Sequence, residues 1–245
     1  MHFLDHLLQL KTDSYLNDRQ KFETDVINSY AKYLTEGGAI MNARYIARIT
    51  YVVLILISMI IPNYLRFLTL NVSLAYIPLE LAYLIKLFIP KRTFEWPLFI
   101  IYLIMFILML PNTFYMVTDL IHLNQFTFNF LAGLDLSEWF HFTLLISSVI
   151  FALYCYVLIV LEIYHLIQTR IVRIGVLFGM MGLNGLGIYV GRFLRFHSVH
   201  IINHPFSVIV RTLKSLDLEA LIFISFMTLI QALIFLFVKG VRSRS

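Results

Sequence analysis

Polar side chains that could hold a metal ion or move a proton follow a proline inside an apolar segment. Four of them recur at intervals of three or four residues directly after Pro111: Asn112, Tyr115, Asp119 and His122. A helix that continued past the proline would carry all four on one face, because residues three and four apart are neighbours on a helix. Asp119 and His122 place a carboxylate beside an imidazole, as a general base or a metal site requires. We therefore predict both as catalytic residues.

A second carboxylate–histidine pair with the same spacing opens a later apolar segment. Together the two pairs could offer a divalent metal four ligands on neighbouring helices: Asp119, His122, Glu138 and His141. Such a metal would polarise a substrate or activate a water molecule. Two observations favour a structural alternative: Glu162 and His165 repeat the spacing at the other predicted membrane boundary, and Asp135 with Glu138 forms the pattern of a helix capping box.

Arginines near residue 192 suggest a site for negative charge. Arg192 and Arg195 could each hold a phosphate or carboxylate with two hydrogen bonds, and we predict them as substrate-binding residues together with Asn112 and Tyr115. The alternative is that the two arginines pair with Asp119 or Glu138 and link three helices. The sequence leaves both interpretations open.

The amino-acid composition indicates whether these residues lie in a soluble protein or in a membrane protein. Of 245 residues, 60% are hydrophobic and only 13% charged, and the mean hydropathy is +0.83. A soluble domain carries about 25% charged residues, so this chain is not a soluble enzyme, a disordered tail or a nucleic-acid-binding domain. The single cysteine, Cys155, excludes an intramolecular disulfide and a cysteine-based zinc site. The chain is predicted to be an integral membrane protein, and its predicted partner is the lipid bilayer.

Apolar stretches long enough to cross a bilayer occur about six times, since a hydrocarbon core about 30 Å thick needs roughly 20 residues. They lie near 46–62, 67–89, 96–111, 139–161, 174–189 and 218–238. We predict an all-α, polytopic membrane helix bundle of about six transmembrane helices over residues 46–240. Residues 1–45 are predicted to be a cytoplasmic amphipathic arm, because Phe22, Val26, Tyr30 and Tyr33 share one helical face.

Basic residues indicate an orientation. With six spans, thirteen Lys and Arg residues lie on the side of both termini and five lie on the other, which makes the termini cytoplasmic by the positive-inside rule. The polar residues after Pro111 then face outward. Five of the eight histidines gather at that boundary: His122, His141, His197, His200 and His204. A short amphipathic segment from Pro205 to Ser215 would roof this outer cluster.

Glycines repeat along the fifth apolar stretch, where two pairs are four residues apart: Gly175 with Gly179, and Gly187 with Gly191. Such spacing lets helices approach closely. It predicts helix packing within the chain, or association with a membrane-protein partner or a second copy.

Three stretches resemble a known family: residues 71–78 (NVSLAYIP), 110–123 (LPNTFYMVTDLIHL) and 187–196 (GIYVGRFLRF). The chain is identified as resembling DUF1361, a family of uncharacterised bacterial multi-pass membrane proteins, over roughly residues 50–238. The resemblance implies a membrane fold and a bacterial cell-membrane location, but no reaction.

The residues lead to one functional hypothesis and one alternative. The hypothesis is a polar, outward-facing site at the membrane interface that binds or processes a lipid or envelope-derived anionic substrate. The alternative is a non-enzymatic small transporter or a helper subunit of a membrane complex. The sequence does not decide whether the chain is an enzyme or whether it holds a divalent metal.

Overall fold

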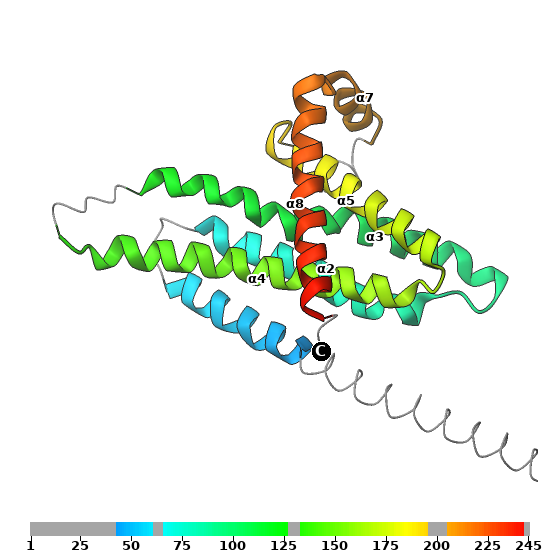
Figure 1. Cartoon of the computed structure of the whole chain (residues 1–245), viewed down its shortest axis with the longest axis horizontal. Coiled ribbons are helices and arrows are strands. Elements are labelled where there is room, and N and C mark those ends of the chain that lie inside the picture. The colour runs from blue at the N-terminus through cyan, green and yellow to red at the C-terminus, as the bar shows by residue number, and fades with distance from the viewer. Residues whose placement is uncertain (1–42, 61–65, 127–132, 196–204, 243–245) are drawn as a thin grey trace, which may run out of the picture. The chain divides into compact units, whose positions relative to one another are not determined.

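The computed structural model describes residues 43–60, 66–126, 133–195 and 205–242, and these residues are almost entirely helical (Figure 1). No β-strand occurs among them, so the predicted all-α class is confirmed. The chain divides into two compact units, Met1–Arg48 and Ile49–Ser245, and the site lies in the second. Most of the predicted amphipathic arm falls in residues 1–42, outside the described residues.

Six helical segments in the described residues are long and apolar enough to cross a membrane, as predicted. They are Ala43–Ile60, Phe67–Phe88, Thr93–Gln125, Leu136–Leu166, Arg170–Arg192 and Leu218–Val241. The elements after the first helix are α2 (Arg66–Phe88), η1 (Thr93–Glu95), α3 (Trp96–Tyr115), η2 (Met116–Gln125), α4 (Leu136–Leu166), α5 (Arg170–Arg192), α7 (Pro205–Ser215) and α8 (Leu218–Arg242). The protein is therefore a multi-pass membrane protein.

The third span changes conformation after its proline rather than at it. α3 continues through Pro111 to Tyr115, and the chain then tightens into the 3-10 helix η2 from Met116 to Gln125. A 3-10 helix has three residues per turn, so residues three apart lie directly in line. Asp119 and His122 therefore share one line of η2, and the α-helix runs about one turn beyond Pro111, where the predicted third stretch ends.

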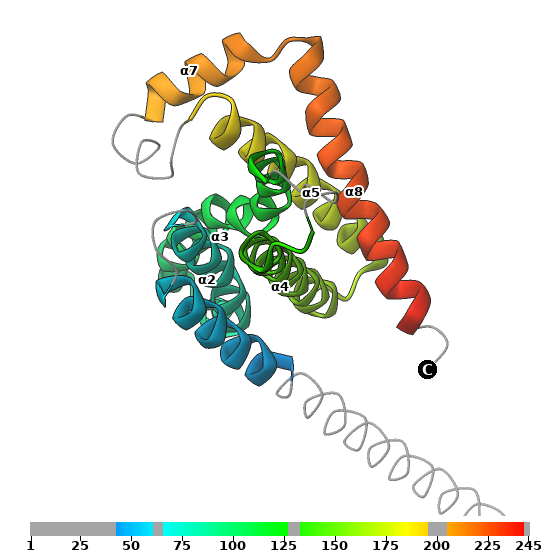
Figure 2. The same cartoon turned by 90° about the vertical axis from the view of Figure 1, so that its left-hand side faces the viewer.

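Helices α5 and α8 lie side by side (Figure 2) and are joined by buried amides. Asn184 Nδ2 donates to Gln231 Oε1 at 2.8 Å, and Gln231 Nε2 donates to the carbonyls of Met181 at 3.2 Å and Met227 at 3.0 Å. A Cβ on Gly185 would lie 2.9 Å from the Ile224 carbonyl oxygen, so the helices touch at this glycine. Small residues and interhelical hydrogen bonds are the usual means of packing helices in lipid.

Lys86 and Glu162 tie α2 to α4 near the ends of both helices. Lys86 Nζ lies 2.6 Å from a carboxylate oxygen of Glu162, which is buried. A buried carboxylate is tolerated where a cation pairs with it. This ion pair and the site described below lie at opposite ends of α2.

Candidate functional site

Three helices meet where α2 begins, where α3 gives way to η2 and where α5 ends. Thr113 Oγ1 donates to the carbonyl of Ala75 at 3.0 Å and joins α3 to α2. On the other side, α5 rests on α3 through glycine. These contacts bring together five residues that we name the Asp119 cluster: Asn71, Tyr115, Thr118, Asp119 and Arg192.

Asp119 is the buried acid of the cluster, with 1% of its surface exposed. Asn71 Nδ2 from α2 donates to Asp119 Oδ2 at 2.7 Å, and Arg192 Nη1 from α5 donates to Oδ1 at 3.2 Å. A buried carboxylate is costly unless it is paired and hydrogen-bonded, and both oxygens have a partner here. The predicted link between Asp119 and an arginine is therefore present, and it holds three helices together.

Arg192 is held by three hydrogen bonds to residues of the third span. Besides Asp119, its Nη1 donates to Tyr115 Oη at 3.1 Å and its Nη2 donates to the Thr118 carbonyl at 2.7 Å. The guanidinium carbon lies 5.3 Å from the centre of the Tyr115 ring, a cation–π contact. Of the side chain, 19% is exposed. A guanidinium has five N–H donors, and these three are the bonds it makes among the described residues, which leaves two donors for another acceptor.

Glycines at the end of α5 make this approach possible. A Cβ on Gly187 would lie 2.4 Å from Cγ of Pro111, and one on Gly191 would lie 3.4 Å from the Tyr115 ring. α3 therefore covers Gly187 and Gly191 within the same chain. Gly175 and Gly179 differ, because nothing among the described residues lies within 4 Å of a Cβ at either.

His122 and Asn112, two other predicted site residues, do not contact Arg192. Each of them contacts residues close to it instead. The His122 ring packs on Phe67 with 4.4 Å between ring centres, and its Nδ1 lies 3.1 Å from Gln125 Nε2. Asn112 Nδ2 donates to the Met109 carbonyl at 3.0 Å. Of the four residues predicted on one face, Tyr115 and Asp119 meet at Arg192, and the other two do not.

Glu138 and His141 lie in the first turns of α4 and form no metal site with the first pair. Asp135 caps this helix by accepting from the backbone N–H groups of Ser137 and Glu138. His141 Nδ1 donates to the Ser137 carbonyl at 2.6 Å. The described part of the chain holds no group of three or more His, Cys, Asp or Glu side chains suited to a metal ion.

In the structure Asp119, His122, Glu138 and His141 do not come together as three or more possible ligands of one metal ion. Each of the first two faces other partners: Asp119 turns inward to Arg192, and His122 packs on Phe67. Three histidines expected at the same boundary, His197, His200 and His204, lie outside the described residues.

Arg195 follows the last turn of α5 and does not join the Asp119 cluster. Its backbone adopts a left-handed conformation with φ of 56°, and the residue is exposed. The chain therefore leaves the helix sharply after Arg192. Arg195 adds a second positive charge three residues beyond the first.

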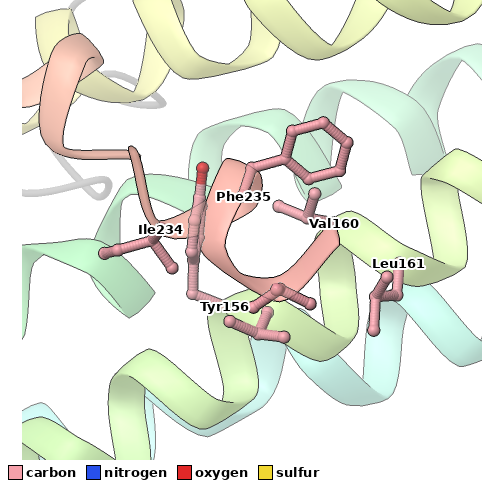
Figure 3. A pocket seen from close by; sticks show the side chains of 7 residues that line it. Tyr156, Val160, Leu161, Ile234 and Phe235 are labelled. Carbon is pink, nitrogen blue, oxygen red and sulfur yellow. The ribbon is translucent and has the colours of Figure 1, made fainter. Parts of the chain in front are cut away.

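One pocket lies away from the cluster, between α4 and α8 (Figure 3). It is lined by Tyr156, Val157, Val160, Leu161, Ile234, Phe235 and Val238. Its cavity volume of about 10 Å³ is enough for at most one water molecule. The Tyr156 hydroxyl finds no hydrogen-bond partner among the described residues, and the other lining side chains are apolar. The pocket is therefore a packing gap and offers no substrate site.

Residue chemistry alone missed two members of the cluster: Thr118, which contributes only its backbone carbonyl, and Asn71, because one amide in an apolar span gives no spacing pattern. A signal was nevertheless present. Asn71 opens the first of the three stretches that carry the family resemblance, Tyr115 and Asp119 lie in the second, and Arg192 lies in the third. The three stretches therefore meet at one place in the fold.

Comparison with known proteins agrees with this resemblance. The family model described as "Protein of unknown function (DUF1361)" matches residues 70–234, a range that contains the whole Asp119 cluster. No curated protein and no solved structure matches the chain.

Proposed function

Since the chain belongs to the DUF1361 family, whose description gives no activity, we propose from the site that it is a membrane-embedded binding protein for an anionic lipid or an envelope-derived anionic substrate. One observation carries the proposal. Arg192 is fixed by three hydrogen bonds, yet 19% of its side chain is exposed and two of its donors have no partner in the part of the chain that the structure describes. A guanidinium held in place loses little entropy on binding, and its planar fork suits phosphate and carboxylate oxygens.

The balance of charge supports an anionic ligand. Asp119 offsets one of the two positive charges on Arg192 and Arg195, so this group carries a net charge of about +1. We assign contact with the ligand to the two arginines, and Tyr115 acts by orienting Arg192. The Asn112 amide already donates within its own helix, which argues against the direct contact predicted for it.

Binding rather than turnover is the better supported role. A general base needs a free lone pair within reach of the substrate proton. Asp119 is only 1% exposed and is paired with Asn71 and Arg192, so its lone pairs are out of reach of a substrate and we assign it as a positioning residue that holds Arg192. His122, packed on Phe67, is assigned no proton transfer.

The proposed location is the bacterial cytoplasmic membrane, with both termini in the cytoplasm and the Asp119 cluster near the outer leaflet. The excess of thirteen basic residues over five on the side of the termini supports this orientation. An anionic ligand would then reach Arg192 from the outer leaflet or the space beyond it.

Arg195→Gln tests the ligand assignment without disturbing the buried ion pair. Removing this exposed charge should weaken binding of phosphatidylglycerol to the detergent-purified protein by about tenfold, the weaker end of a charge-assisted hydrogen bond. Native mass spectrometry of lipid adducts gives the affinity, with phosphatidylcholine as the neutral lipid. Lys239→Gln, which removes an exposed charge near the end of α8, is the matched control and should change nothing. Equal effects of both substitutions would refute a ligand at Arg195.

The second candidate function is a helper subunit that associates through α5. It is favoured by the open space around Gly175 and Gly179, a small-residue pair at helix-packing spacing. Gly179→Leu should then reduce self-association in lipid to near the monomer level, as counted by single-molecule photobleaching. Unchanged association in Gly179→Leu would exclude this surface. Gly187 is unsuitable for the test because it packs within the chain.

A further inference from the structure

Helix α7 presents three different faces along its eleven residues. Val208 is buried, and Thr212 and Ser215 are half-buried on the same side, which packs on the protein. Large apolar side chains form a second face and are exposed: Phe206 (84%), Ile209 (54%), Val210 (45%) and Leu213 (64%). At 100° per residue these four fall within an arc of about 100°. Arg211 and Lys214 are exposed on the third face, between the other two.

The chain fixes α7 at the point where a membrane span begins. Tyr189 Oη of α5 donates to the Ser215 carbonyl at 2.8 Å and pins the last residue of α7. Asp217 Oδ1 then accepts from Ala220 N at 2.8 Å in the first turn of α8, the sixth apolar span. α7 is itself only about 16 Å long, too short to cross a bilayer. It therefore lies at the level where α8 enters the membrane.

We propose that α7 is a membrane-surface helix that lies in the interface of a leaflet rich in anionic lipid. Its exposed apolar face, led by Phe206 and Leu213, enters the boundary of the acyl chains. Arg211 and Lys214 lie at headgroup level and attract lipid phosphates. Two leucines in the first turn of α8, Leu218 and Leu221, are also exposed and follow this apolar face in the sequence. They lie at the start of the sixth apolar span, where we expect them to contact lipid.

Lipid fits these faces better than a second protein does. A protein interface core is depleted in charged residues, whereas α7 places two cations beside its apolar face. Basic residues that flank an apolar face are typical of helices that lie in the headgroup region. The proposal concerns the membrane surface around α7 and does not depend on which ligand Arg192 binds.

Fluorescence quenching in proteoliposomes tests the depth of α7. Single cysteines are introduced as Phe206→Cys, Leu213→Cys or Lys214→Cys in the full chain carrying Cys155→Ala, which removes its one native cysteine. Each is labelled with bimane and quenched either by iodide in water or by a nitroxide near the top of the acyl chain. Labels at 206 and 213 should be quenched several-fold more by the lipid nitroxide than by iodide, and the label at 214 should show the reverse.

Two results would overturn the interfacial position. Equal iodide quenching at all three positions would place α7 in water, and protection of 206 and 213 from both quenchers would indicate a protein partner. The charge requirement is tested by Arg211→Gln with Lys214→Gln in the Leu213→Cys background. In phosphatidylglycerol vesicles, lipid quenching at 213 should fall to its level in phosphatidylcholine vesicles. Unchanged quenching would refute the role of the two cations, and Lys239→Gln, which removes an exposed charge near the other end of α8, should leave it unaltered.

Discussion

Asp119→Ala should lower the free energy of unfolding by about 3–5 kcal/mol, the usual cost of removing one partner from a buried ion pair. The substitution removes the acceptor of Arg192 Nη1 and of Asn71 Nδ2 at a position that is 1% exposed. It also cuts the link between α2, η2 and α5. Equilibrium unfolding of the detergent-solubilised protein, followed by circular dichroism, measures the loss.

Two further variants give this prediction its controls. Glu219→Ala removes an exposed carboxylate from the first turn of α8 and should cost less than about 1 kcal/mol, as surface substitutions do. Asp119→Asn combined with Arg192→Met should recover most of the stability, because no charge is left unpaired and the new side-chain amide can still accept from Asn71. If Asp119→Ala were as stable as Glu219→Ala, the ion pair would not hold these helices together.

Gly187→Ala should lower the free energy of unfolding by about 1–3 kcal/mol, the cost of overpacking a close contact. Its Cβ would lie 2.4 Å from Cγ and 2.8 Å from Cβ of Pro111. The proline ring is part of the α3 backbone and cannot rotate away, so α5 must move. That movement would also shift Arg192, one and a half turns further along the same helix.

Gly179→Ala is the matched control, because it introduces the same methyl group on the same helix where nothing lies within 4 Å. Alanine is the better helix former by about 1 kcal/mol, so Gly179→Ala should be neutral or slightly stabilising. Thermal unfolding of both variants in one detergent makes the comparison. Equal stability of the two would mean that α5 does not rest on Pro111.

The membrane spans were predictable from sequence because they depend on one local property, apolar length. Each predicted stretch corresponds to a described span, with ends that differ by several residues. The 3-10 helix after Tyr115 was not predicted, since the residues from Met116 to Gln125 contain neither proline nor glycine to mark it. Tertiary contacts with Asn71 and Arg192 accompany the tighter conformation.

The candidate site was predictable only in part, for a geometric reason. Spacing along one helix places Tyr115 and Asp119 on a shared face, and both do meet Arg192. Spacing does not give the rotation of one helix against another. The predicted metal ligands Glu138 and His141 therefore belong to a separate turn of α4.

Glycine spacing was ambiguous for the same reason. Gly175 with Gly179 and Gly187 with Gly191 have the same separation in sequence, but only the second pair is covered by α3. Pro111 and Tyr115 are the residues of α3 that pack on this pair, and the glycine spacing alone does not predict them. Only the packed helices distinguish the two pairs.

The most direct test of the proposed function is lipid binding by the Asp119→Asn/Arg192→Met protein. This variant removes the fixed guanidinium while leaving no buried charge unpaired, so binding and folding can be measured separately. We expect wild-type protein to retain phosphatidylglycerol but not phosphatidylcholine in native mass spectra, and the folded variant to lose that retention. A folded variant that binds phosphatidylglycerol as tightly as wild-type protein would contradict the assignment of Arg192 as the anion-binding residue.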